Sequence, residues 1–317
     1  MNGTEKLDLT EKPAGMPVSP DERNIEQSNK IEEKNRVIGG TLYLVATPIG
    51  NLADMSARAI KVLGEVDFIA AEDTRNTLKL LSLFGISKPL VSYFEHNKVE
   101  RGEYITSRLK QGESCALVTD AGTPAISDPG EDIVRMCVEQ NIPVTAVPGC
   151  CAAINALTLS ALPTGSFVFE GFLKGSDGEK RKKLEELANE RRTVILYEAP
   201  HRLRDTLRMI LECMGERRIS LCREMTKINE EIIRTTTGKA VIYYDEREPR
   251  GEYVLVIDGA PKELSDCFWE HMSAAEHVKF YMELGHPKME AIKLVAKDRR
   301  VGKNKIYKEL LETGGEE

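Results

Sequence analysis

The chain has little of what marks a membrane, secreted or metal-binding protein. None of its apolar runs approaches the length of a membrane span, and the first residues lack the basic start and apolar stretch of a signal peptide. We therefore expect a cytoplasmic protein with no membrane partner. Its seven cysteines form no C-x-x-C pair and its five histidines are scattered, so no spacing fits zinc and no metal site is expected.

Nucleotide-phosphate signatures are absent too. No G-x-G-x-x-G opens a helix, and no G-x-x-x-x-G-K-[ST] supplies a phosphate-binding lysine. What is present is a pair of loops rich in glycine and proline, V-A-T-P-I-G-N-L-A-D at 45–54 and D-A-G-T-P-A-I-S-D-P-G at 120–130. Each follows an apolar run typical of a buried parallel strand. Because α/β sheets bind ligands at the carboxyl ends of their strands, the two loops predict a small-ligand site that is not a phosphate cradle.

The apolar pattern divides the chain into four parts. Residues 1–38 are polar and favour a disordered extension. Residues 39–163 alternate strand and helix, which indicates an α/β domain with a parallel sheet, and in residues 164–260 the strands follow one another faster, which indicates a second α/β domain with a mixed sheet. Residues 261–317 predict a small, basic, helix-turn-helix-like module. The cleft between the two α/β domains is the expected place for the ligand.

The same pattern gives the expected elements of each part. Strands are expected near 42–47, 67–72, 89–94, 114–120, 143–147, 167–172, 193–198, 218–223, 231–236 and 253–258. Helices are expected near 56–65, 76–84, 100–111, 129–140, 179–191, 202–214, 273–284, 287–299 and 303–313.

Six motifs that occur in one order resemble a known family. They are Thr47–Leu52 (T-P-I-G-N-L), Ala71–Arg75, the 120–130 loop, Val147–Gly149, Tyr197–Arg202 (Y-E-A-P-H-R) and Cys222–Glu224. Over roughly residues 39–313 the series resembles the ribosomal RNA small subunit methyltransferase I family, within the tetrapyrrole-methylase superfamily. The resemblance implies a two-domain tetrapyrrole-methylase-like fold, S-adenosylmethionine as cofactor, and methylation of the 2′-hydroxyl of a cytidine in small-subunit (16S) ribosomal RNA. It also implies a homodimer, with this RNA or the assembled small ribosomal subunit as partner.

Methyl transfer from a sulfonium to an oxygen is an in-line displacement, so positioning outranks acid–base power. Because the donor's charge disperses in the transition state, backbone carbonyls suit the sulfur better than carboxylates do. Bent loops are therefore expected around the donor. The residues expected to bind it are Pro48, Asp120, Gly122, Thr123, Pro124, Ser127, Pro148 and Gly149. Asp and Ser also cap turns and helices, which is the alternative for Ser127 and for Asp128 beside it.

A ribose hydroxyl is a poor nucleophile unless a base or cation is near. Glu198 and His201 follow a second-domain strand, and we expect them to be the catalytic residues. Glu72 and Asp73, which follow the second strand of the chain, are alternatives. His201 also precedes a helix, so helix capping is its other interpretation.

Basic residues predict contact with the RNA backbone. The expected contacts are Lys174, Arg202, Lys297, Arg299, Arg300, Lys303 and Lys305. A solvated helix face is the alternative for the C-terminal cluster, but that concentration of positive charge is unusual in a chain of net charge −7.

Two other functions stay open. A methylase of a tetrapyrrole or another small molecule would carry the same donor loops, because fold does not decide substrate. The basic C-terminal module and the T-P-I-G-N-L and Y-E-A-P-H-R signatures favour RNA over that alternative. A non-catalytic RNA-binding protein would need no cleft loops, so the intact 120–130 loop argues against it.

Overall fold

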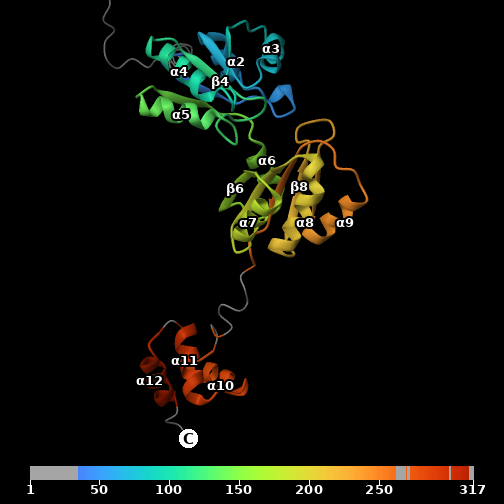
Figure 1. Cartoon of the computed structure of the whole chain (residues 1–317). Coiled ribbons are helices and arrows are strands. Elements are labelled where there is room, and N and C mark those ends of the chain that lie inside the picture. Colours follow the sequence, from blue (N-terminus) through green and yellow to red (C-terminus); the bar gives the residue numbers. More distant parts are fainter. Residues whose placement is uncertain (1–34, 262–268, 270–271, 300, 314–317) are drawn as a thin grey trace, which may run out of the picture.

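The computed structural model describes residues 35–261, 269, 272–299 and 301–313, so the N-terminal extension up to residue 34 lies outside the described residues. Two five-stranded sheets and a group of three helices follow one another along the chain (Figure 1).

The first sheet is entirely parallel and has the strand order β3-β2-β4-β1-β5. Its strands are β1 (Leu42–Val45), β2 (Phe68–Ala71), β3 (Leu90–Ser92), β4 (Cys115–Val118) and β5 (Val144–Val147). Helices α2 (Ala57–Glu65) and α3 (Thr74–Leu83) pack on one face, and α4 (Lys98–Lys110) and α5 (Gly130–Glu139) pack on the other.

Strand β4 shows why this sheet forms. All four of its residues are buried: Ala116 and Val118 pack with α2 and α3, while Cys115 and Leu117 pack with α4 and α5. A strand that is covered on both faces needs a continuous apolar run, which is what its sequence supplies. All five strands run in one direction, so their carboxyl ends and the loops that follow them meet at one edge of the sheet.

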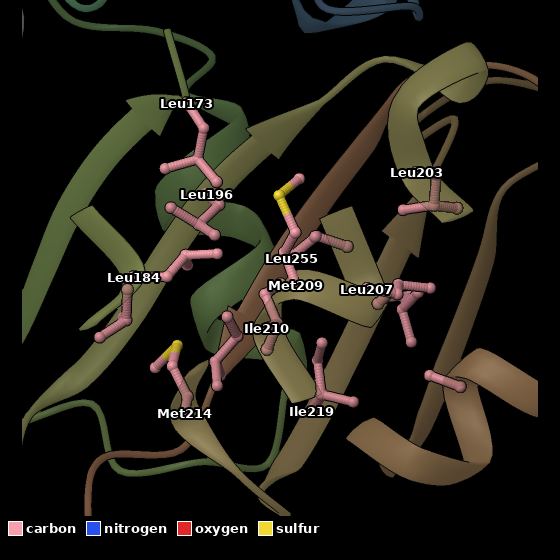
Figure 2. Packing of buried hydrophobic residues seen from close by; sticks show 14 of the residues in the cluster. Leu173, Leu184, Leu196, Leu203, Leu207, Met209, Ile210, Met214, Ile219 and Leu255 are labelled. Atoms are coloured by element: carbon pink, nitrogen blue, oxygen red, sulfur yellow. The ribbon is translucent and has the colours of Figure 1, made fainter. Parts of the chain in front are cut away.

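The second sheet is mixed and has the order β6-β7-β10-β8-β9, in which only β6 and β7 are parallel. Its strands are β6 (Phe167–Phe172), β7 (Thr193–Glu198), β8 (Arg218–Arg223), β9 (Glu231–Thr236) and β10 (Tyr253–Ile257). Helices α7 (Asp177–Leu187), α8 (Leu203–Met214) and α9 (Thr237–Asp245) cover one face. Figure 2 shows the core on that face, where leucine, isoleucine and methionine side chains of the helices meet alternate residues of the strands.

Two helices were not expected from the sequence. Helix α6 (Ala152–Leu159) falls within the range assigned to the first domain, but it packs against the other face of the second sheet, on Ile195, Val254 and Val256. It is apolar on most sides, so it has no polar face to reveal a helical period. Helix α9 contains the run V-I-Y-Y, whose side chains favour strands, and tertiary packing overrides that preference.

Helices α10 (Ala274–Glu283), α11 (Lys288–Asp298) and α12 (Lys303–Thr313) form a small core of their own. His277 is fully buried within it and stacks between the rings of Trp269 and Tyr281. The three expected C-terminal helices are thus present, with ends within two residues of the expected ones.

Candidate active site

The two glycine- and proline-rich loops are joined to each other at the edge of the first sheet. The N–H of Thr47 donates to the carbonyl of Gly122 (2.9 Å), and the N–H of Gly122 donates back to Thr47 (3.0 Å). Gly122 has φ +84°, a conformation that side chains with a Cβ rarely adopt. The sequence predicted that the two loops share one ligand site. The bridge shows that they are hydrogen-bonded into one unit.

A cavity of about 550 Å³ lies between this unit and the second domain. The first domain contributes Ile49, Glu72 and two stretches of one loop, 119–123 and 126–128. The second sheet contributes the carboxyl ends of β7 and β8 and the start of β10, which register puts side by side: Tyr253 pairs with Glu198 on one side and with Arg223 on the other. The expected inter-domain cleft is therefore present.

Left-handed backbone is concentrated around this cavity. Ala125 and Ser127 in the first domain and Glu224 and Thr226 in the second have φ between 50° and 67°. Such conformations cost free energy in residues other than glycine and persist where surrounding contacts hold them. The Asp128 carboxylate supplies those contacts in the first loop, because it accepts hydrogen bonds from the N–H groups of Ala125, Ile126 and Gly130. Asp128 is thus a loop cap, which was the alternative for this residue.

Two close contacts fix the loops against the second domain. The N–H of Asn51 donates to Thr226 Oγ1 (3.1 Å). Gly171, at the bulge of β6 and with φ +63°, lies so near Ser127 that a Cβ would collide with the serine oxygen. Neither contact joins residues that are close in sequence, so the width of the cavity depends on tertiary structure.

The wall from the second domain is made of side chains that are hydrogen-bonded in place. Glu198 is 3% exposed, and its carboxylate accepts from the N–H of Ala199, from Arg202 Nε (3.0 Å) and from the hydroxyl of Thr206. Both of its oxygens are therefore engaged. Glu198 thereby holds the Arg202 side chain just after the end of β7.

A second cluster of charges lies at the end of β8. Lys227 donates to Glu224 (2.8 Å) and Glu252 (3.0 Å), and this lysine lowers the pKa of the Glu224 carboxyl. Tyr197 completes the wall: its hydroxyl accepts from the N–H of Ala153, its ring lies between Phe169 and Phe172, and burial raises its pKa to about 12. Tyr197 therefore stays neutral and adds no charge to the wall.

Two other carboxylates of the cavity, those of Asp120 and Glu72, form no ion pair with a basic side chain among the described residues. Within the described residues, the Asp120 side chain makes no hydrogen bond or ion pair, and it lines the cavity beside Glu72. Burial, together with the negative charges of Asp120 and Asp128, raises the pKa of the Glu72 carboxyl. Asp73 differs, because hydrogen bonds from Arg75 lower its pKa to about 2, and it caps α3. Of the two alternatives to Glu198, Glu72 is thus the better proton acceptor.

The expected donor-binding residues fall into three groups. Asp120, Gly122, Thr123 and Ser127 line the large cavity. Pro48 lines a smaller cavity next to it. Pro124, Pro148 and Gly149 do not line either one; Pro124 is buried, and Gly149 packs so tightly on Ala46 that it has no room for a Cβ. Thr123 also donates to the carbonyl of Cys150 (2.8 Å), which ties its loop to the 147–151 turn.

The residues expected at catalysis and at RNA are spread more widely. His201 is exposed in the short helix η2 (Pro200–Arg202) and does not line the cavity. Lys174 is exposed just after β6, and Lys297, Lys303 and Lys305 are exposed on α11 and α12. Arg299 has a structural task, because it donates to His277 Nδ1 and to the carbonyls of Met272 and Ser273. Arg300 lies outside the described residues.

Sequence reasoning missed several residues of the cavity wall. Phe172, Met225, Lys227, Glu252 and Val254 line it, and none belongs to a loop that the motifs singled out as a ligand site. Their positions depend on how the strands of the second sheet pair, Phe172 through β6 with β7 and the others through β10 with β7 and β8. In the part of the chain that the structure describes, no three Asp, Glu, His or Cys side chains are grouped to hold a metal ion. No described helix combines the length and the apolar character that crossing a membrane requires.

Comparison with known proteins agrees with this architecture. The family model for Tetrapyrrole (Corrin/Porphyrin) Methylases matches residues 41–241. A ribosomal RNA small subunit methyltransferase I of Halalkalibacterium halodurans is 48% identical over 84% of this chain and 93% of its own, and one of Bacillus subtilis is 47% identical over the same shares. This chain belongs to the ribosomal RNA small subunit methyltransferase I family. The family named from the six motifs is thereby confirmed.

Solved structures confirm the fold of this methyltransferase. A cobalt precorrin-4 methyltransferase of cobalamin biosynthesis superposes with a TM-score of 0.51 at 17% identity, covering 69% of this chain and 95% of the other. A diphthine synthase superposes with a TM-score of 0.52 at 12% identity, covering 69% and 89%. At these identities the likeness concerns the fold alone. The α/β fold with one parallel and one mixed sheet, predicted from the sequence, is confirmed.

Proposed function

We propose that the protein transfers the methyl group of S-adenosylmethionine to the 2′-hydroxyl of a cytidine ribose in small-subunit ribosomal RNA. The observation that carries the proposal is the loop-lined cavity of about 550 Å³ in a chain that is 48% identical to a relative named for this RNA.

The cavity fits S-adenosylmethionine by its lining. Apolar and aromatic groups, among them Ile49, Tyr197 and Val254, offer room for a purine ring, and the backbone from Thr119 to Thr123 offers donors and acceptors to ribose and amino-acid groups. When bound there, the donor supplies an electrophilic methyl group whose C–S bond breaks as the O–CH₃ bond forms. The chain's part is to hold the acceptor oxygen in line and to take up the proton that the hydroxyl loses.

Glu72 is suited to take up the proton that the ribose hydroxyl loses. Its carboxyl lines the cavity, and its raised pKa makes it a stronger base than an ordinary glutamate. Glu198 and His201 remain predicted site residues. For Glu198 we propose that it acts through Arg202, whose guanidinium it holds at the rim of the cleft, where a phosphate of the RNA can pair with it.

Other parts of the proposal concern partners. Lys174, Lys297, Lys303 and Lys305 are exposed cations that suit the RNA backbone, and we assign Arg299 to the internal structure of the C-terminal module instead. We propose a homodimer, as the family resemblance implies, and a cytoplasmic location, as expected from the sequence. Light scattering tests the dimer, and a monomer at working concentration would contradict it.

The deciding experiment uses small ribosomal subunits from cells that lack the gene. Purified protein is incubated with them and with methyl-labelled donor, and the RNA is digested to nucleosides. We expect label in 2′-O-methylcytidine. Label in a base or in another nucleoside would overturn the proposal, and so would an unlabelled RNA in a sample where calorimetry shows that the donor binds. Labelling of an added tetrapyrrole instead would favour the small-molecule alternative, which the relatives' names and the basic C-terminal helices weigh against.

A further inference from the structure

A second cavity, of about 180 Å³, lies beside the large one on the first domain. Thr47, Pro48, Gly50 and Leu52 form one side of it. Asn76, Thr77 and Leu80 of α3 form the other side, and Thr119 and Asp120 lie at its end. Nothing in the function proposed so far uses this space.

The 47–52 loop separates the two cavities. Ile49 lines the large cavity, while Pro48 and Gly50 on either side of it line the small one. The loop is held by the Thr47–Gly122 bridge at one end and by the hydrogen bond from Asn51 to Thr226 at the other. It is therefore a fixed partition, and the two cavities meet only where they share Thr119 and Asp120.

The lining of the small cavity suits one flat heterocycle. Leu52 is 48% exposed in a short helix that buries none of its residues, so its side chain stands at the cavity without a protein partner to cover it. Leu80 faces the cavity from α3. Two polar side chains have hydrogen-bonding capacity to spare: within the described residues neither the Asn76 amide nor the Asp120 carboxylate makes a side-chain hydrogen bond. An amide and a carboxylate are suited to the mixed donor and acceptor edge of a nucleobase.

Positive charge flanks the same face of α3. Arg75 and Lys79 are four residues apart and form the row next to Asn76 and Leu80 on the helix surface. Both are exposed, Arg75 with 86% of its side chain even though it pairs with Asp73. A nucleotide whose base lies in the cavity would bring its phosphates toward such a row.

The geometry points to the small cavity as the pocket for the base of the target pyrimidine nucleotide, with Leu52 and Leu80 against its faces and Asn76 at its edge. The inference rests on the proposed function. It places the ribose of that nucleotide at the Asp120 junction, where acceptor and donor meet. The volume, about a third of that of the larger cavity, suits a single ring rather than a purine nucleoside.

The test fills the pocket. Leu80→Trp adds bulk inside it, and Leu78→Trp, on the same helix at a residue that is 55% exposed and lines neither cavity, is the matched control. We expect Leu80→Trp to lower kcat/KM for unmethylated small subunits by about tenfold or more while donor affinity stays within about twofold of the parent, because the base no longer fits its pocket and the donor cavity is intact. Leu78→Trp is expected to match the parent in both.

Asn76→Ala tests recognition of the base. On subunits carrying cytidine or uridine at the target position, the parent should prefer cytidine, and we expect Asn76→Ala to reduce that preference by about tenfold. If Leu80→Trp and Asn76→Ala methylate with parental kcat/KM and preference, the pocket lies elsewhere. A parent protein that binds donor but labels no subunit would contradict the proposed function itself, so the two failures are distinguishable.

Discussion

The two sheets present different surfaces to the same cleft. The first sheet is parallel, so loops leave the ends of its strands and line the cleft with bent backbone, such as Gly122 of the Thr47–Gly122 bridge and the left-handed residue Ser127. The second sheet is mixed, and there β7, β8 and β10 line the cleft with side chains that are fixed by hydrogen bonds, such as Glu198 with Arg202.

This difference assigns the two halves different tasks. Backbone groups carry no net charge, so they suit a sulfonium whose positive charge is lost during the transfer. Ion-paired side chains hold their positions against a mobile anionic partner and suit phosphate. We therefore expect changes in the glycine- and proline-rich loops of the first domain to affect donor affinity, and changes in the second domain and in the C-terminal helices to affect stability and RNA.

The largest effect is expected at Gly122. A valine there would force a β-branched residue into φ +84° and place its Cβ 3.4 Å from Ile49. We expect the substitution Gly122→Val to lower donor affinity about hundredfold and to destabilise the fold by about 2 kcal/mol. Calorimetry with S-adenosylmethionine and thermal unfolding measure the two. Gly165→Val, at a glycine with no neighbour within 4 Å of its Cβ, is the control and should bind as the parent does. Equal affinities would show that the bridge does not shape the donor site.

A change at Glu198 tests the second domain, where the cleft is lined by side chains that are fixed by hydrogen bonds. Glu198→Ala leaves Thr206 and the N–H of Ala199 without their acceptor in a buried site, and we expect a loss of about 2 kcal/mol in the free energy of unfolding. Glu198→Gln keeps the shape and most of the hydrogen bonds, so it should restore most of the stability and of the methylation rate. A Gln variant that is stable but inactive in single turnover would show instead that Glu198 itself takes the proton.

A smaller effect is expected from the C-terminal lysines. Replacing Lys297, Lys303 and Lys305 by Gln should leave donor affinity unchanged and flatten the salt dependence of RNA binding by about 0.7 log unit for each lysine that pairs with a phosphate, because fewer counterions are released. Binding to small subunits across a salt series measures the slope. Three exposed lysines of the α/β domains, Lys61, Lys110 and Lys239, changed in the same way are the control. A slope equal to that of the parent would make the α11–α12 surface a solvated helix face.

The smallest effect on stability is expected at Glu72. Because its pKa is raised in the folded protein, the folded state favours the protonated form. Its contribution to stability is therefore full below about pH 4.5 and is lost as the pH rises through the raised pKa. Glu72→Gln, which cannot ionise, should raise the melting temperature slightly at pH 7 and leave it unchanged near pH 4. A lower melting temperature at pH 7 would show that charged Glu72 is stabilised by its surroundings.

The sequence predicted the local structure of the cleft well where one short segment carries the information. The apolar run of β4 and the glycines and prolines after it specify a strand and a bent loop without help from elsewhere. The sequence predicted side-chain positions and contacts less well, because these depend on how the chain turns and on which distant segments pack together. His201 adjoins Glu198 in a strong motif, yet only Glu198 lines the cavity, because the chain turns into η2 between them. Arg299 sits in a basic cluster, and only its neighbours His277 and Met272 reveal that it holds the module together.

By itself, the sequence determined the family, the parallel and mixed sheets, and the bent loops at the strand ends that we propose bind the donor, because apolar period and turn residues act over a few neighbouring positions. Tertiary structure alone decided which carboxylates are engaged and which face the cavity. All four line the cavity: Glu198 and Glu224 are held there by Arg202 and Lys227, while Glu72 and Asp120 are paired with no basic side chain among the described residues. The physical reason is that hydrogen-bond partners and neighbouring charges are set by strand register and by packing between segments as far apart as Asn51 and Thr226.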